Sequence, residues 1–442
     1  MVFLPARSFA ELITALPGQS SNVSFRQYSG YIVTDTQHGR ALFYYFVEAD
    51  SPNPLLHPLT LWLNGESNML YVETPVGVGF SYSNTSSDYI NWNDTQTAQE
   101  NLQFIVNWFQ EFPKYRDLDL YLTGESYAGH YIPQLGALLL DYNKQPNVKP
   151  INLRAIALGN RLLGIDISIN DAEYYWSHGV ISDEMLMLKK TVCNDTRYPI
   201  ENINHNLSKE CIDVFKKLDE EVGDYTDSGD LLLPICLSQS VAGQSVSEGV
   251  HDALHSKVSR NFLTSRTTIG DPCLRDRIFL YLNKPKVQEA LHANTTHLVS
   301  PWDFCSGPLS YQKDNIAINI IPLIAAFLKA GLPVLLYSGD QDSKIPLTQT
   351  RIIANMLARD LKLISFRRYG PWYDKMQVGG WTQSFGRLRK GENVTYLMFT
   401  TVRGVAHEVR FTFPSQALTM FRAFLRGSAL AGDRIIEESN PT

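Results

Sequence analysis

The order of strand and helix patterns along the chain limits its fold more than any other property of the sequence. Two alternating, aromatic-rich runs at 25–35 and 40–49 predict a hairpin whose turn lies near Gln37–Gly39. Strand and helix patterns alternate up to residue 161, the region 162–296 is looser and mainly helical, and the alternation returns over 297–442. We therefore predict an α/β sheet in two parts, 1–161 and 297–442, separated by a cap insertion at 162–296.

The apolar periodicity also places the individual elements. Asp94 is the expected N-cap of a helix that Pro113 stops, and a second helix follows Tyr127. The strands are predicted at 61–63, 69–72, 119–124, 151–160, 333–339 and 394–402, and a closing helix at 417–427.

Composition excludes several classes of protein. The chain has 442 residues, of which 44% are hydrophobic, so it can bury a large core. Its net charge of −6 and the lack of a long basic run argue against nucleic acid or an anionic membrane as the main partner. No uninterrupted apolar stretch reaches the length of a membrane span.

Seven Asn-x-Ser/Thr sequons favour a glycosylated protein of the secretory pathway. The first residues lack the apolar core of a signal peptide, because Arg7 and Glu11 interrupt them. We therefore expect a signal upstream of this N-terminus and a secreted or vacuolar location. The sequons start at Asn22, Asn84, Asn93, Asn194, Asn206, Asn294 and Asn393.

The five cysteines point to the same compartment. Four of them fall within the predicted insertion, where disulfides would brace a region with a small core of its own. An odd number leaves one thiol without a partner in the chain, and the four in the insertion permit three pairings. The cysteines are Cys193, Cys211, Cys236, Cys273 and Cys305.

The stretch LYLTGESYAGHYIP at 120–133 carries the sharpest chemical signal. A buried strand ends near Thr123 and a helix begins near Tyr127, so Ser126 occupies the turn between them. Small residues at Gly124 and Ala128 permit the tight turn that exposes a nucleophilic serine, although Ala128 replaces the second glycine of the strict G-x-S-x-G pattern.

A serine nucleophile needs a base and an acid that orients the base, in the chain order Ser, Asp, His for this type of fold. Asp340 and Asp342 both follow a predicted strand, and His407 follows the last strand, so strand ends would bring them to one edge of the sheet. Asp340 could instead cap its loop, and His130 is better explained as a packing residue of the helix after Ser126.

The stretches around Ser126, Asp342 and His407, together with blocks elsewhere in the chain, resemble the serine carboxypeptidase family, and most closely its plant serine carboxypeptidase-like branch. The resemblance implies an α/β-hydrolase fold with a helical cap, and the roles of nucleophile for Ser126, orienting acid for Asp342 and general base for His407. It covers nearly the whole chain, in the blocks LPGQ, QYSGYI, LFYYFVEA, LTLWLNG, NMLYVETPVGVGFSYS, TGESYAGHYIPQL, ALGN, WSHGVIS, VQEALHA, PVLLYSGDQD, QVGGWTQSF and VRGVAHEV.

The resemblance further implies how a peptide end is recognised. Asn64 and Glu125 would bind the terminal carboxylate, which requires a protonated acid and so favours acidic pH. The oxyanion hole would use the backbone N–H of Tyr127 and one from the glycine-rich loop that begins at Gly65, in which Glu66 stands where the second glycine belongs. The implied disulfides are Cys193–Cys211 and Cys236–Cys273, and no cofactor or metal is implied. The oligomeric state is left open, with a homodimer among the expectations.

One family segment is missing from this chain. In the family, WLNG continues into a glycine-rich loop and a few dozen further residues before the NMLYVE strand, whereas here only Glu66 and Ser67 intervene. We expect the family partner of Cys305 and one oxyanion donor to be lost, with a rate penalty of about 10²–10³. The five residues 64–68 between the two predicted strands are also expected to be too few for a parallel crossover, so the strands could form an antiparallel hairpin through Asn64-Gly65.

Three functions follow from these observations. The leading one is a serine carboxypeptidase that acts on peptide or protein C-termini and is impaired in this chain by the missing loop. An acyltransferase with the same triad and a non-catalytic secreted glycoprotein are the alternatives. Arg410 stands where the family tends to have proline, and we expect little effect from that difference.

Overall fold

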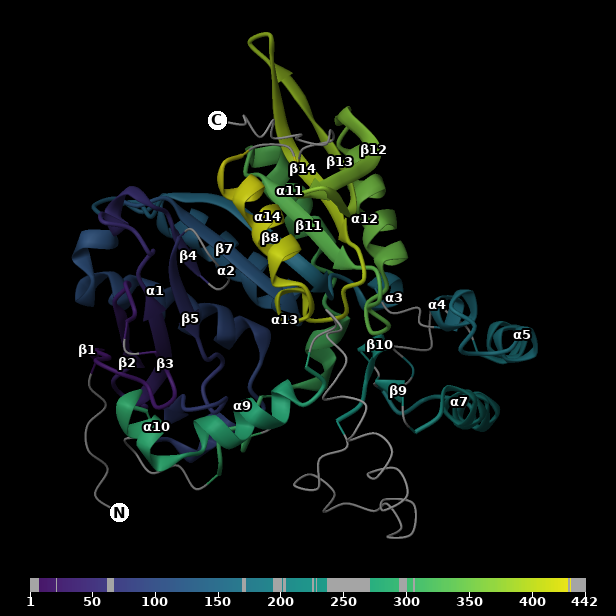
Figure 1. The fold of residues 1–442 in the computed structure, drawn as a ribbon, viewed down its shortest axis with the longest axis horizontal. Helices are drawn as coiled ribbons and strands as arrows, with labels where there is room; N and C mark the ends of the chain where they lie inside the picture. Colours follow the sequence, from purple (N-terminus) through teal and green to yellow (C-terminus); the bar gives the residue numbers. More distant parts are fainter. Residues whose placement is uncertain are drawn as a thin grey trace, which may run out of the picture.

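The computed structural model describes residues 8–20, 22–61, 67–168, 172–193, 201, 204–224, 226–227, 229–236, 271–293, 300–304, 307–427 and 430. In this part of the chain one large mixed sheet runs through the molecule, in the order β1-β2-β3-β5-β4-β7-β8-β11-β14-β13-β12, with β6 paired to β3 (Figure 1). Its strands are β1 Phe9–Leu12, β2 Gln27–Asp35, β3 Arg40–Val47, β4 Leu59–Leu61, β5 Asn68–Val72, β6 Tyr82–Ser83, β7 Leu120–Ser126, β8 Leu153–Arg161, β11 Val334–Gly339, β12 Ile364–Asp374, β13 Gln377–Arg389 and β14 Glu392–Val402.

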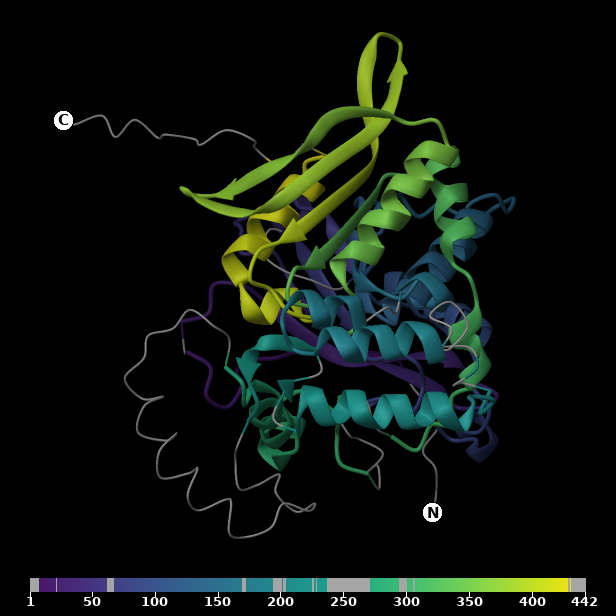
Figure 2. The same ribbon diagram turned by 90° about the vertical axis from the view of Figure 1, so that its right-hand side faces the viewer.

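Helices cover both faces of the sheet. Successive side chains of a strand point to opposite faces, and on the central strands both sets are apolar and buried. On β8, Leu158 belongs to the core beneath one helical layer, whereas its neighbour Ala157 faces the other layer. The first layer contains α1 Asp94–Glu111, α2 Ala128–Tyr142, α11 Ile321–Ala330 and α12 Leu347–Asp360. The second contains α14 Pro414–Leu425, with the short α13 Val409–Thr412 before it, and lies opposite α12 in Figure 2. Short 3₁₀ helices occupy Pro54–Leu56, Ser86–Tyr89, Pro113–Tyr115 and Lys313–Ala317.

Most sequence-predicted elements of the two sheet-forming parts are confirmed. The hairpin is β2–β3, paired antiparallel, and the strands and helix around Ser126 are β7 and α2. One cap was misplaced: Asn93, not Asp94, is the N-cap of α1, because its extended backbone lets its Oδ1 accept a hydrogen bond from the N–H of Gln96 at 2.9 Å. The edge strands β12 and β13 and the helix α12 were missed.

The strands β4 and β5 pair in parallel, so the predicted antiparallel hairpin is wrong. The register places Leu59 beside Asn68 and Leu61 beside Leu70, with only residues 62–67 between the strands. This is possible because β4 is very short. From the end of β4 the chain must run back along the length of three residues, about 7–10 Å, to reach the level at which β5 begins. It must also move sideways by one strand spacing of about 4.8 Å. A long helical crossover is therefore not required here.

The described residues of the region 162–296 are mainly helical and lie beside the sheet (Figure 1). Helices α5 and α7 pack together and share a small apolar cluster. The Cys193–Cys211 disulfide is part of this cluster and links the end of α5 to α7. The elements are α3 Ile165–Ser168, α4 Ala172–Ser177, α5 Asp183–Val192, α7 Lys209–Val222, β9 Thr226–Asp227, β10 Asp230–Pro234, α9 Leu274–Leu282 and α10 Pro285–Ala290. The last two pack against β1–β3, and the domain boundaries stay a prediction.

Among the described helices, none combines the length and apolar character that crossing a bilayer demands.

Candidate active site

Ser126 lies on a sharp turn between β7 and α2. Its backbone φ is +58°, a left-handed conformation that a residue with a side chain seldom adopts outside a constrained turn. The turn depends on small neighbours, because a Cβ on Gly124 would come within 2.5 Å of the Cβ of Ala128, and one on Gly129 within 2.3 Å of the carbonyl oxygen of Leu162. Alanine at 128 is thus compatible with this turn, while Gly129 supplies the close approach to the end of β8.

Asp342 and His407 come together at the same edge of the sheet. The Nδ1 of His407 lies 2.9 Å from Oδ2 of Asp342, whose side chain is fully buried. The other carboxylate oxygen, Oδ1, accepts hydrogen bonds from the backbone N–H groups of Lys344 and Ile345 at 2.9 and 3.2 Å. The two backbone N–H groups hold the carboxylate of Asp342 in one orientation. The carboxylate in turn holds the imidazole ring of His407 in one orientation.

The second candidate acid, Asp340, bonds to a loop backbone and not to His407. Its Oδ1 accepts a hydrogen bond from the backbone N–H of Gly404 at 2.6 Å and so joins the loop after β11 to the loop after β14. This is the loop-capping role that sequence left as an alternative for Asp340. The residue that contacts His407 is Asp342.

Asn160 braces the loop that carries His407, and sequence reasoning did not find it. Its fully buried amide donates to the carbonyl oxygens of Ala406 and His407 at 3.0 and 2.7 Å, and its Oδ1 accepts from the N–H of Gly339 at 2.9 Å. A side chain that satisfies three backbone groups across two strand ends holds the base in position. The only sequence signal was the position of Asn160 near the end of a buried strand.

Ser126 and His407 line one cavity of about 490 Å³. Tyr127 and Glu125 also line it, and apolar walls come from α1 and α2, for example Phe104 and Ile132. Its mixture of apolar walls and a few polar groups beside a candidate nucleophile is typical of a site for an organic ligand.

Glu125, which lines this cavity, has a raised pKa. Burial raises its pKa to about 7, with Glu408 acting in the same direction; the charges of Arg410 and His407 and the hydrogen bond from Tyr337 act to lower it. The hydroxyl of Tyr337 donates to Oε1 of Glu125 at 3.2 Å, and burial keeps the pKa of Tyr337 itself well above its usual value. Glu125 can therefore change its charge near neutral pH.

A buried acid, Asp94, supports the helix behind Ser126. Its Oδ1 accepts from the hydroxyls of Tyr127 and Tyr311 at 3.1 and 2.6 Å, and its Oδ2 contacts Nδ1 of His130 and Nε2 of Gln134 at 2.8 and 2.9 Å. Burial would raise the pKa of Asp94, but the hydrogen bonds from His130 and Tyr311 outweigh it and hold the pKa below its usual value. His130 is thus a buried structural residue, as its helix position predicted.

Some candidate residues lie outside the described part of the chain. These are Asn64, Gly65 and Cys305, together with the sequon residues Asn194 and Asn294. Of the other sequon residues, Asn22, Asn206 and Asn393 are exposed, and Asn84 and Asn93 are partly buried.

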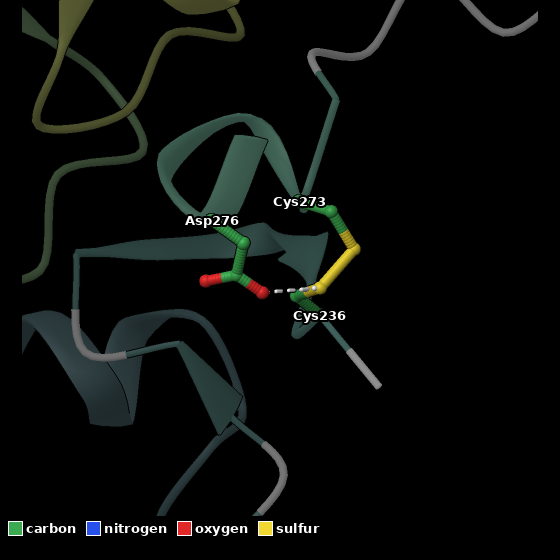
Figure 3. Close-up of side chains that lie close together, drawn as sticks. All are labelled: Cys236, Cys273 and Asp276. Atoms are coloured by element: carbon green, nitrogen blue, oxygen red, sulfur yellow. Dashed lines mark hydrogen bonds between the residues drawn. A yellow bond between two sulfur atoms is a disulfide. The ribbon is translucent and has the colours of Figure 1, made fainter. Parts of the chain in front are cut away.

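Three side chains that could suggest a metal site gather within the insertion, near the start of α9. Cys236 and Cys273 lie beside Asp276, whose Oδ2 is 3.0 Å from the sulfur of Cys236 (Figure 3). The two cysteines form a disulfide, so neither can provide the thiolate that binds a metal. Both disulfides that the family resemblance implied are therefore present.

Comparison with known proteins decides the family. A sequence profile described as serine carboxypeptidase matches residues 17–65 and 66–427. This chain belongs to the serine carboxypeptidase family. Serine carboxypeptidase-like 45 of Arabidopsis thaliana is 41% identical, with 96% of this chain and 94% of the relative covered. Serine carboxypeptidase 24 of the same plant is 36% identical, with coverages of 95% and 92%.

The solved structure of another carboxypeptidase has a similar fold. The prohormone-processing carboxypeptidase Kex1Δp of Saccharomyces cerevisiae matches with a TM-score of 0.57 over 90% of each chain, at 17% sequence identity. The fold class is α/β-hydrolase, as the resemblance implied, and the described residues contain two disulfides.

The family profile matches in two pieces that meet between Gly65 and Glu66. The alignment with serine carboxypeptidase-like 45 has 461 positions, although 96% of 442 residues is only about 424 residues of this chain. The relative therefore contains segments that this chain lacks.

Proposed function

We propose that this chain is a serine carboxypeptidase in which Ser126 is the nucleophile, His407 the general base and acid, and Asp342 the residue that orients His407. The observation that carries the proposal is the 2.9 Å contact between Asp342 and His407 at a cavity that Ser126 also lines. Its substrates are peptides with a free C-terminus, as the family membership suggests.

The chemistry follows from these positions. Ser126 Oγ attacks the carbonyl carbon of the last peptide bond while Nε2 of His407 takes the hydroxyl proton. Because Nδ1 is engaged by Asp342, Nε2 is the ring nitrogen available for this transfer. The imidazolium then gives the proton to the leaving amine. In the second half of the reaction water takes the place of the amine: His407 takes a proton from the water, the oxygen attacks the acyl carbon, and His407 returns the proton to Ser126 Oγ as the acid is released. The backbone N–H of Tyr127 is the proposed donor to the oxyanion.

A reduced rate is part of the proposal. The family resemblance implies that a second oxyanion donor, and a second acid that helps to bind the substrate carboxylate, come from a segment that this chain lacks between Gly65 and Glu66, where the family profile divides. Losing one such donor costs about 10²–10³ in rate. We expect slow turnover relative to the relatives that contain the segment.

Labelling with a fluorophosphonate tests the nucleophile directly. The chain, secreted with an added signal peptide, is expected to be labelled, and the Ser126→Ala variant is not. Release of the last residue from an N-blocked dipeptide would then identify a carboxypeptidase, whereas transfer from an acyl-glucose donor to an alcohol would identify the acyltransferase. A folded, soluble protein that is not labelled would contradict the proposal and favour a non-catalytic glycoprotein.

The pKa of Glu125 predicts the pH dependence of substrate binding. Below about pH 7 its neutral carboxyl can donate a hydrogen bond to the substrate carboxylate, and above that pH its charge repels the substrate. We expect KM for a peptide acid to rise about tenfold between pH 6 and pH 8. In Glu125→Gln the rise should vanish, because glutamine does not titrate. An equal rise in both proteins would assign the pH effect to another group.

A further inference from the structure

The cavity beside Ser126 runs into the core of the molecule. Its walls include the end of β7, from Thr123 to Ser126, and α1 contributes Phe104 and Ile105. The helices α1 and α2 pack together over this face of the sheet, so the cavity lies between them and β7. The lining residues at the start of α2 recur at spacings of three and four, which places them on one side of the helix. They are Tyr127, Ala128, Tyr131, Ile132 and Leu135.

Two elements give the same depth for this cavity, whose volume is about 490 Å³. From Ser126 back to Thr123, β7 extends over three residues, or about 10 Å. From Tyr127 to Leu135 the helix α2 runs back along the sheet in the same direction and rises by about 12 Å. An extended chain advances about 3.4 Å for every three bonds, so this depth matches a straight chain of about nine or ten bonds.

The interior of the cavity is apolar. Phe104, Ile105 and Leu135 are only 1–2% exposed and belong to the core between the sheet and its helices. Ile132 is also buried in this core. Cavities with walls of this kind stay dry and bind apolar molecules.

The polar side chains of the interior are already bonded to protein groups. The hydroxyl of Thr74 donates to Oδ1 of Asn101 at 2.7 Å. The hydroxyl of Thr123 donates to the carbonyl oxygen of Leu61 at 2.9 Å. Neither hydroxyl therefore requires a polar group of a ligand as its acceptor.

The charged residues of the cavity stand at its other end, near Ser126. Lys344 and Glu408 follow β11 and β14, whose ends form the edge of the sheet that carries the proposed triad. Arg275, at the start of α9, forms an ion pair with Glu408. A matching ligand is therefore amphipathic, with its polar reacting group at Ser126 and an apolar chain between α1 and α2. The other titratable residues of the cavity are Glu125, His407 and Arg410.

The cavity also reaches the two strands between which the family profile divides. Leu61 is the last residue of β4 and Val72 the last residue of β5, and both line the cavity. The profile divides between Gly65 and Glu66, in the connection of these strands. The cavity therefore adjoins the point at which this chain departs from the family profile.

We propose that this cavity binds the acyl chain of esters of straight-chain fatty acids with about eight to ten carbons. This inference rests on the proposed function, because Ser126 and His407 carry out the reaction, and it names a further substrate class. Ser126 Oγ attacks the ester carbonyl carbon while its proton passes to Nε2 of His407. The C–O bond to the alcohol breaks, and the alcohol leaves with that proton. Water then cleaves the acyl-Ser126 bond, which gives the fatty acid and free Ser126.

Rates with the 4-nitrophenyl esters of acetic, butyric, hexanoic and octanoic acid test the inference on the unaltered chain. Each methylene that enters the cavity should raise kcat/KM about fourfold, relative to hydrolysis of the same ester by hydroxide. From the butyryl to the octanoyl ester the rise should therefore be about 10²-fold. This series needs no variant and thus no assumption about folding.

Leu135→Phe places a larger side chain at the deep end of the cavity. We expect the ratio of the octanoyl to the butyryl rate to fall at least about tenfold, because the longer chain no longer fits. Leu138→Phe is the matched control: it makes the same change on the same helix, at a half-buried residue outside the cavity lining, and should keep the ratio. Thermal melting of both variants shows whether they are folded.

Binding to a catalytically silent protein provides a readout besides turnover. In the Ser126→Ala background, calorimetric titration compares octanamide with butanamide, which differ by four methylenes. We expect octanamide to bind about 10²-fold more tightly. Leu135→Phe in the same background should remove most of this difference, and Leu138→Phe should not.

Three outcomes would overturn the inference: equal rates from the acetyl to the octanoyl ester, a length preference that survives in folded Leu135→Phe protein, or an equal loss in Leu138→Phe. Failure of the proposed function looks different. In that case the unaltered chain would neither be labelled at Ser126 nor cleave any ester, while the Ser126→Ala protein would still bind octanamide more tightly than butanamide.

Discussion

Asp342→Asn is expected to lower kcat about 10⁴-fold while leaving the fold intact. Asparagine has nearly the same shape, but its amide group cannot hold the imidazole of His407 with a proton on Nδ1 and an acceptor on Nε2. The wrong tautomer then faces Ser126 and cannot take its proton. The effect should be large because Asp342 is fully buried and contacts Nδ1 of His407 at 2.9 Å. Peptidase assays over pH 4–8 measure it.

Asp340→Asn is the matched control, since it makes the same chemical change two residues away. Asparagine keeps an oxygen that can accept the hydrogen bond from Gly404, so we expect activity within about tenfold of the wild type. The labelling rate of Ser126 with a fluorophosphonate should follow kcat in both variants. Comparable losses in the two variants would show that the loop as a whole matters, and that Asp342 has no special relation to His407.

Sequence was sufficient where a local pattern fixes local structure. The strand–turn–helix around Ser126 was predictable because apolar periodicity and small residues at Gly124 and Ala128 both demand it. The order of strands and helices gave the fold class for the same reason. The choice between Asp340 and Asp342 required the family resemblance, because composition and spacing place both acids at one strand end.

Contacts between distant segments were not predictable in this way. Asn160 binds the backbone of the His407 loop from 246 and 247 residues away, and Asp94 collects donors from α2 and from Tyr311, 217 residues further on. Nothing in the sequence near Asn160 or Asp94 marks these partners. From sequence, little effect was expected of Arg410, which stands where the family tends to have proline, whereas in the structure it lines the same cavity as Ser126 and Glu125.

The prediction for β4 and β5 was wrong for a different reason. The sequence rule for parallel strands assumes elements of ordinary length, for which a short connection cannot return to the start of the next strand. β4 has three residues, so the return path is short. β4 and β5 therefore lie side by side in parallel although the family profile divides between them, at Gly65 and Glu66.

This parallel pairing makes a restoration experiment possible. β4 lies beside β7 in parallel, with Leu61 next to Leu122, so the chain leaves β4 at the edge of the sheet where Ser126 follows β7. Inserting the corresponding segment of serine carboxypeptidase-like 45 between Gly65 and Glu66 would return a glycine-rich loop to that edge. We expect kcat/KM for an N-blocked dipeptide to rise about 10²–10³-fold, because one oxyanion donor is regained.

An insertion of equal length made of glycine and serine is the control, and it should leave the rate unchanged or lower. A second readout is independent of activity. Four of the five cysteines form disulfides, so the native chain should have one titratable thiol. If the inserted loop cysteine pairs with Cys305, as the family resemblance implies, the restored chain should have none. Faster turnover with the thiol still present would place the loop near Ser126 without that disulfide. An unchanged rate with the thiol consumed would show that the absent segment is not what limits catalysis, because the loop would then be in place and the missing donor would lie elsewhere.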